Sequence, residues 1–219
     1  RGHSDADWHL LPSVKRLYTD EKERALVHDF YIKSKTLQKN TPKRKDYAGW
    51  LTIMQHYGLP TRLLDWSKSP LIAAYFATEK KTSVNNDACI WALCPSELNA
   101  SFEYGRYLYP MDKPSVKKLL YPAFNNKNDT EDNNALQINN SVIACLAVEH
   151  NMRVYVQQSA FTVHNSNIPL DQLDNNENWL VKYIIPRENK KQFSISLMLL
   201  GFEIDNIYPD LDHISKSLL

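Results

Sequence analysis

Hydrophobic residues recur at roughly helical spacing in two segments of the first third of the chain. Leu26 and Phe30 give residues 22–35 an apolar stripe, and residues 46–57 show the same periodicity, which is typical of amphipathic helices. A glycine and a proline follow the second segment, as is usual where a helix ends. A third helix is predicted over residues 71–78, because a serine and then a proline come just before its apolar residues.

Compact apolar runs elsewhere in the chain predict strands. The expected strands are the end of a strand at residues 1–4, a short one at 61–65, and runs at 88–93, 142–148, 153–156, 160–163 and 179–185. Residues 190–200 return to helical spacing until Gly201, and a short final helix follows residues 207–211. The Asn- and Asp-rich residues 125–140 predict a loop or insertion.

Helices and strands do not alternate regularly along this pattern, which excludes a βαβ repeat. We therefore expect an α+β fold, with a helical first half packed on a mainly antiparallel sheet. The chain has 219 residues, of which 43% are hydrophobic, which suits a single domain over residues 1–219. It begins at Arg1 rather than Met, so we expect a trimmed domain or a processed chain.

The charge, the hydrophobic runs and the cysteines of the chain limit which partners and which cellular compartment we expect. The chain has 26 basic and 25 acidic residues, so no whole-domain field recruits nucleic acid or a membrane surface. No apolar run approaches the roughly 18 residues of a membrane span. The cysteines Cys89, Cys94 and Cys145 cannot all pair with one another. We expect them to be reduced and buried in a cytoplasmic protein.

Residues 55–66 are the most unusual segment, because they gather polar side chains around one helix end and one short strand. Such positions often carry sites, since a rigid element aims the side chain. Arg62 and Asp65 either pair with each other as a structural ion pair or serve a site. His56 is either a structural histidine or, beside these two residues, a general base.

The residues just described resemble the FRG domain family. The resemblance rests on Arg1-Gly2, Trp8 with Leu11-Pro12-Ser13, Gln55 to Trp66, Pro70-Leu71 and Ala73 to Ala77, Arg153 to Gln157, Ala160 to His164, and Tyr208 to Asp212. It spans nearly the whole chain, but the family name does not define a reaction.

The order of these motifs is also similar to that of the ADP-ribosyltransferase fold. An Arg-Gly lies at a strand end, a later short strand leads into a serine, and a helix with an Ala-x-x-Phe-Ala pattern follows, here Ala73 to Ala77. This resemblance implies a fold of that type and NAD as the substrate. Residues 65–67 occupy the place of the fold's Ser-Thr-Ser strand end. An acid must stabilise the ribosyl cation, but the late strand has Gln157 where that fold has a glutamate, so Asp65 or Glu149 takes this role or the domain only binds its ligand.

The same resemblance assigns the site residues. The expected catalytic residues are Arg1, Arg62, Asp65 and Gln157, and the expected NAD-binding residues are Arg1, Gly2, His56, Trp66, Ser67, Phe76 and Phe161. The implied partner is a macromolecular acceptor, nucleic acid or protein, together with an antitoxin or inhibitor protein if the domain is a bacterial toxin or antiviral effector.

Two other functions remain open from the sequence. His56, Arg62 and Asp65 are also the residue types of a metal-independent nuclease, and the same segment suits a ligand-binding module without catalysis. The histidines show no HxxxH or HxH spacing and Cys89 and Cys94 have no second pair, so no metal site is predicted.

Overall fold

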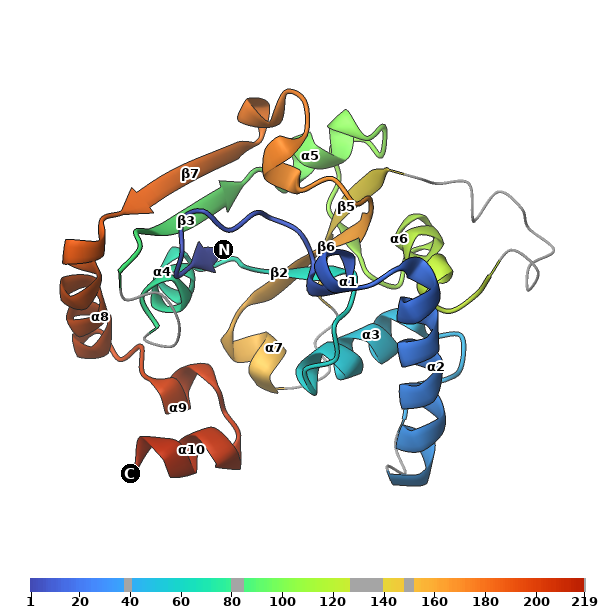
Figure 1. The fold of residues 1–219 in the computed structure, drawn as a ribbon, viewed down its shortest axis with the longest axis horizontal. Coiled ribbons are helices and arrows are strands. Elements are labelled where there is room, and N and C mark those ends of the chain that lie inside the picture. Colours follow the sequence, from blue (N-terminus) through green and yellow to red (C-terminus); the bar gives the residue numbers. More distant parts are fainter. Residues whose placement is uncertain (38–40, 80–84, 127–139, 148–151, 219) are drawn as a thin grey trace.

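The computed structural model describes residues 1–37, 41–79, 85–126, 140–147 and 152–218, and its strands form two sheets (Figure 1). The three-stranded antiparallel sheet has the order β1 (Gly2–His3), β3 (Ala88–Leu93), β7 (Leu180–Ile185). The four-stranded sheet has the order β2 (Leu63–Ser67), β6 (Ser159–Asn165), β5 (Ser141–Leu146), β4 (Tyr109–Pro110), with only β4 and β5 parallel.

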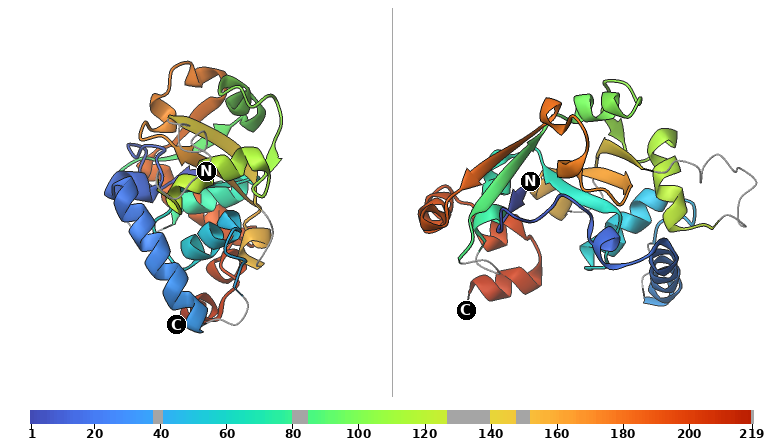
Figure 2. Two further views of the ribbon diagram at one scale, coloured as in Figure 1. Left: turned by 90° about the vertical axis from the view of Figure 1, so that its right-hand side faces the viewer. Right: turned by 45° about the horizontal axis from the view of Figure 1, so that its top comes forward.

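The helices pack around these sheets, and α5 also contributes Leu98 to the core between them. They are α1 (Ser13–Leu17), α2 (Asp20–Leu37), α3 (Tyr47–His56), α4 (Pro70–Thr78), α5 (Pro95–Ser101), α6 (Pro114–Leu120), α7 (Met152–Val156), α8 (Lys190–Leu199), α9 (Ile204–Ile207) and α10 (Leu211–Ser217). Helices α2 and α8 lie at opposite ends of the molecule (Figures 1 and 2). The predicted α+β class is confirmed.

The predicted helix ends are confirmed in detail. Asp46 accepts a hydrogen bond from the Gly49 amide at the start of α3, and Ser69 does the same for the Ile72 amide at the start of α4. Gly58 and Gly201, which follow α3 and α8, both have a φ of 81°. Glycine adopts this left-handed conformation without steric cost, so it ends each helix.

Three predictions need correction. Residues 153–156 were expected to be a strand but belong to helix α7, because tertiary packing overrides the strand preference of Val154 and its neighbours. The first half contributes strands to both sheets, so the helices do not pack on a single sheet. Cys94 is exposed, whereas Cys89 and Cys145 are buried as expected. Of the predicted loop at 125–140, residues 127–139 lie outside the described part of the chain.

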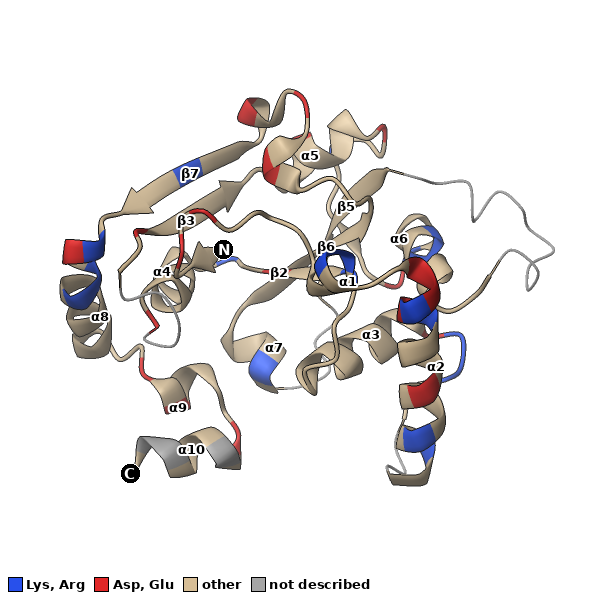
Figure 3. Ribbon diagram, viewed as in Figure 1, with Lys and Arg blue, Asp and Glu red and all other residues tan. Residues whose placement is uncertain are grey.

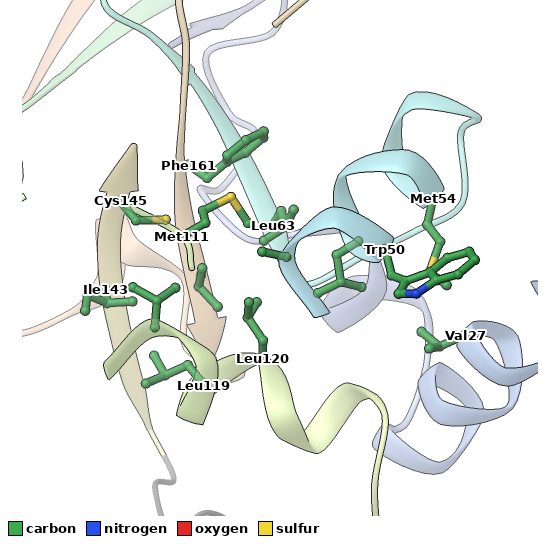
Figure 4. Close-up of a cluster of buried hydrophobic side chains, with 14 residues drawn as sticks. Val27, Trp50, Met54, Leu63, Met111, Leu119, Leu120, Ile143, Cys145 and Phe161 are labelled. Atoms are coloured by element: carbon green, nitrogen blue, oxygen red, sulfur yellow. The ribbon is translucent and has the colours of Figure 1, made fainter. Parts of the chain in front are cut away.

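The alternation of side chains along β2 separates two hydrophobic cores. Leu63 belongs to a cluster with Trp50 and Met54 of α3, Leu119 and Leu120 of α6, Val27 of α2 and Phe161 of β6 (Figure 4). Leu64 and Trp66 point to the opposite face, into a cluster with Cys89 and Trp91 of β3 and Leu180 of β7. The second core therefore lies between the two sheets and joins them.

Charged residues are spread over the molecule rather than gathered. Helix α2 carries both signs along its length (Figure 3), in agreement with the near-neutral net charge. None of the described helices is long and apolar enough to cross a membrane.

A buried ion pair fixes the start of β2. Arg62, which is 0% exposed, donates through Nε to Glu23 Oε1 at 2.9 Å and through Nη2 to Glu23 Oε2 at 2.6 Å. Its Nη1 donates to the Leu119 carbonyl at 2.9 Å and to Asn165 Oδ1 at 3.0 Å. One guanidinium thus holds α2, α6 and the end of β6 to β2.

Strand β1 lies so close to α4 that only glycine fits at position 2. A Cβ added to Gly2 would lie 1.9 Å from the Ala73 carbonyl oxygen and 2.6 Å from the Ala77 amide nitrogen. Both atoms belong to helix backbone and cannot rotate away. The small residues Ala73 and Ala77 permit this approach, which brings α4 directly behind the first strand.

We predict that Arg62→Met lowers the free energy of unfolding by about 3–5 kcal/mol, because it leaves the Glu23 carboxylate buried without its partner. Urea unfolding followed by circular dichroism measures this loss. The matched double variant Arg62→Met/Glu23→Leu removes both charges, so it should recover most of the loss. A single variant as stable as the wild type would contradict the structural role of the pair.

We also predict that Gly2→Ala lowers the free energy of unfolding by about 3 kcal/mol through overpacking against α4. The comparison variant is Gly58→Ala, at which nothing lies within 4 Å of an added Cβ. Gly58→Ala should lower the free energy of unfolding only by about 1–2 kcal/mol, the cost of a non-glycine residue in the left-handed conformation. Urea titration of both variants tests the close approach, and a smaller loss for Gly2→Ala than for Gly58→Ala refutes it.

Candidate functional site

A cavity of about 370 Å³ lies where β1 and β2, an outer strand of each sheet, approach one another. Strands β2 and β6 form one wall, since Asp65 pairs in register with Phe161 and Ser67 with Ser159. Helices α3, α4 and α7 supply the rest. The lining residues are Arg1, Gly2, His3, Ser4, Trp8, Thr52, Gln55, His56, Asp65, Trp66, Ser67, Ala73, Phe76, Glu79, Arg153, Val154, Gln157, Ser159 and Phe161.

Most of the predicted site residues line this one cavity, although they come from distant parts of the sequence. The predicted residues in its lining are Arg1, Gly2, His56, Asp65, Trp66, Ser67, Phe76, Gln157 and Phe161. Gly2 owes its identity to the packing of α4 described above. Trp66 reaches the cavity only at its margin: its side chain lies in the core between the sheets and its indole donates to Thr162 Oγ1 at 3.0 Å.

Arg62 is the predicted catalytic residue that the cavity does not include. Its guanidinium is fully buried against Glu23, and it does not pair with Asp65. The alternating geometry of the strand explains the separation, because the chain carries Arg62 away from the cavity before Asp65 turns toward it. The nuclease hypothesis required Arg62 beside His56 and Asp65, and that group is not assembled.

Arg1 connects the two outer strands. Its Nη1 donates to the Asp65 carbonyl at 2.7 Å, and its Nε donates to His3 Nε2 at 2.9 Å. Because His3 accepts at Nε2, its Nδ1 carries the proton and donates to the Trp8 carbonyl at 3.2 Å. Burial, and then the charge of Arg1, lowers the pKa of His3 to about 3. His3 is therefore neutral and holds Arg1 by accepting a hydrogen bond.

Asp65 lines the cavity together with Arg1 and Arg153. The surrounding protein raises its pKa above the ordinary aspartate value by desolvation, while the charges of Arg1 and Arg153 and a hydrogen bond from Gln55 oppose this rise. Gln55 is itself held by the Thr61 hydroxyl, whose hydrogen it accepts. An acid held in this way can interact strongly with a cation that forms beside it.

Helix α7 brings Arg153 to the cavity, and the turn that follows the helix brings Gln157. The main-chain amide of Gln157 donates to the Arg153 carbonyl at 2.9 Å. Gln158 then adopts a φ of 47°, and the chain continues into β6. The Gln157 side chain donates to the Ile207 carbonyl at 3.1 Å, so it also ties α7 to α9. Arg153 was not among the predicted site residues.

Glu79, just after α4, is a second carboxylate in the lining, and sequence reasoning also missed it. It accepts a hydrogen bond from the Tyr208 hydroxyl at 3.5 Å. The other acid proposed from the sequence, Glu149, lies outside the described residues. His3 and Gln55 are two further polar lining residues that were not predicted. The only signal was position, since each lies within two residues of a predicted site residue or of the recognised motif.

His56, at the end of α3, is half-buried beside the Tyr57 ring, with 5.0 Å between ring centroids. Burial and the nearby charge of Arg153 lower its pKa below the ordinary histidine value, while Asp210 acts in the opposite direction. Within the described ranges, no group of three His, Cys, Asp or Glu residues is arranged to hold a metal ion.

One of three comparisons with known proteins finds a match, over the first part of the chain. The family model of the FRG domain matches residues 1–86, so the FRG domain recognised in the sequence is confirmed over that segment. The match includes the cavity residues of β1, α3, β2 and α4 and ends before α7 and β6. No curated protein and no solved structure matches this chain.

We predict that the neutral His3 makes the protein less stable as the pH falls. An unfolded histidine takes up a proton near its usual pKa of 6.5, whereas folded His3 resists protonation down to about 3. Between these values the unfolded state binds more protons, so the free energy of unfolding declines as the pH decreases.

The test is urea unfolding of wild type and His3→Gln at pH 7, 6, 5 and 4. The variant should show a shallower decline over this range, because it lacks one of the groups that must protonate on unfolding. Buried His164, whose pKa is also lowered to about 3, continues to contribute in both proteins. Equal slopes for the two proteins would show that folded His3 takes up its proton in the same pH range as an unfolded histidine, which contradicts the lowered pKa.

Proposed function

We propose that this domain binds NAD in the cavity and transfers its ADP-ribose to a macromolecular acceptor, releasing nicotinamide. The observation that carries the proposal is the lining of one cavity by Arg1, Asp65 and Gln157, which lie in three distant parts of the chain. The resemblance of the motif order to the ADP-ribosyltransferase fold, which singled out these three residues, also supports the proposal.

The proposed reaction needs little from the protein beyond position and charge. The bond between C1′ of the ribose and the pyridinium nitrogen breaks, and its electron pair neutralises the nicotinamide that leaves. The ribose then carries an oxocarbenium charge, which the Asp65 carboxylate stabilises. A nucleophile of the acceptor attacks C1′ and loses its proton to the Asp65 carboxylate or to water.

The lining supplies the other groups that such a substrate requires. Arg1, held by His3, provides charged donors for the diphosphate. Phe76 and Phe161 supply apolar ring surface for a base. A second cavity of about 400 Å³ shares Arg1, Trp66, Ser67, Ala73 and Phe161 with the first, so the adjoining space suits a ligand with two halves.

Asp65 replaces the late-strand glutamate in this scheme. Gln157 carries no charge and its amide nitrogen already donates to the Ile207 carbonyl, so it cannot stabilise a cation as a carboxylate does. We assign it to orienting the substrate and fixing α7. Asp65 is an acid of the same lining, and the charges of Arg1 and Arg153 both favour its ionised form.

We predict that the wild-type protein releases nicotinamide from NAD, and that Asp65→Asn slows this release by about 100-fold or more. The estimate corresponds to the loss of one preorganised electrostatic group in a transition state. Chromatography of the products measures nicotinamide, and NAD labelled in its adenylate half, incubated with cell extract, reports transfer to an acceptor.

The matched control is Asp174→Asn, which removes the charge of an exposed aspartate outside the cavity and should leave the rate unchanged. Glu79→Gln tests the other carboxylate of the lining and should lower the rate less than Asp65→Asn. Wild-type protein that leaves NAD intact in the presence of extract refutes the proposed function. Degradation of RNA or DNA without NAD would support the nuclease instead.

A further inference from the structure

Two arginines of the cavity have no carboxylate partner within 4.0 Å among the described residues. The ion pairs in this part of the protein do not include Arg1 or Arg153. By contrast, the buried Arg62 and the exposed Arg106 are both paired with a glutamate. The two cavity arginines nevertheless act together on one acid, since both lower the pKa of Asp65 against the effect of burial.

An aromatic ring outside the cavity determines the position of Arg153. The guanidinium carbon of Arg153 lies 4.9 Å from the centroid of the Tyr208 ring, which is the distance of a cation–π contact. This contact orients the guanidinium without using its N–H groups, so they stay available to a ligand. A carboxylate partner in place of Tyr208 would occupy these donors and cancel the charge.

Tyr208 is itself held from several sides. Its ring stacks on His213, with 4.3 Å between centroids and 12° between planes, and meets the edge of Phe76 at 6.1 Å. Its hydroxyl donates to Glu79 at 3.5 Å. Asp210 caps α10 and accepts from His213 Nδ1 at 2.6 Å. Residues 204–213 thus form a bracket behind α7, which the Gln157–Ile207 hydrogen bond secures.

We propose that Arg153 and Arg1 together bind the diphosphate of the substrate, and that Tyr208 is the positioning residue of Arg153. Arg153 is then a binding residue, and the bracket of residues 204–213 is part of the site. The identity of the ligand as NAD rests on the proposed function above, whereas the binding of a diphosphate does not.

The charge order of the cavity favours this ligand chemistry. Arg153 can meet one phosphate of a diphosphate through paired N–H donors, and Arg1 can meet the other through Nη2, beyond its own hydrogen bonds to His3 and the Asp65 carbonyl. Asp65, whose pKa the charges of Arg1 and Arg153 both lower, weakens the binding of a simple polyanion but attracts a ligand that carries a positive charge beside its phosphates. A dinucleotide with a pyridinium ring has both the phosphates and the positive charge, whereas inorganic pyrophosphate has only the phosphates.

We predict that inorganic pyrophosphate binds the wild-type protein and that Arg153→Met weakens this binding by about tenfold or more, as expected for loss of charge-assisted hydrogen bonds. Isothermal titration calorimetry at low ionic strength gives the Kd. The matched control is Arg44→Met, which removes one exposed positive charge outside the cavity and should change the Kd by less than about twofold, because the change is confined to screened long-range charge.

Two substitutions of Tyr208 test its positioning role. Tyr208→Leu removes the cation–π contact and should weaken pyrophosphate binding by about threefold to tenfold. Tyr208→Phe keeps the ring and loses only the hydroxyl, so it should bind within about twofold of the wild type. Thermal melting of both variants identifies any loss of folding. A loss caused by removal of the hydroxyl would appear in Tyr208→Phe as well, whereas a loss caused by removal of the ring would appear only in Tyr208→Leu.

Asp65→Asn separates this inference from the proposed function. It should tighten pyrophosphate binding, because it removes a negative charge beside the ligand, although it slows the proposed reaction with NAD. Pyrophosphate binding that Arg153→Met leaves unchanged, or no binding to the wild type, overturns the inference. Binding that follows the predicted order in a protein inactive on NAD keeps the inference and rejects only the proposed function.

Discussion

The buried contact between Arg62 and Glu23 is the constraint on which the arrangement of the site depends. It joins residues 39 positions apart and also engages the Leu119 carbonyl and Asn165. Because removing one partner of such a pair leaves a buried charge uncompensated, the geometry is strongly enforced. The fixed position of Arg62 sets where β2 begins, and the alternation of the strand then directs Asp65 to the cavity and Leu64 to the core between the sheets.

Local structure was the part that the sequence could predict. Caps such as Ser69 before Pro70, and glycines such as Gly58 after α3, act within a few residues, so their effect is visible in the sequence. The division of strands between two sheets is not local. It depends on which faces of β2 and β3 bury Leu64 and Cys89 against each other, and no spacing rule contains that information.

The site was predictable to the extent that motifs mark it. Asp65 and Arg62 were equal candidates in the sequence, because both are charged residues in one motif; only the distant partner Glu23 distinguishes them. Arg153 was missed although it lies four residues before the predicted Gln157, because the motif alone does not show the contact with Tyr208 that holds its guanidinium. Glu79 follows a helix without a motif of its own.

The two kinds of arginine in this protein show how burial assigns a role to the same side chain. Arg62 has its charge neutralised by Glu23, its donors engaged and no contact with solvent, so it can only hold the fold. Arg153 rests on an aromatic ring that leaves its donors and its charge available. Since transferring an unpaired charge into protein is costly, a cavity lined by such an arginine and by an acid agrees with the proposed ligand, which carries both charges.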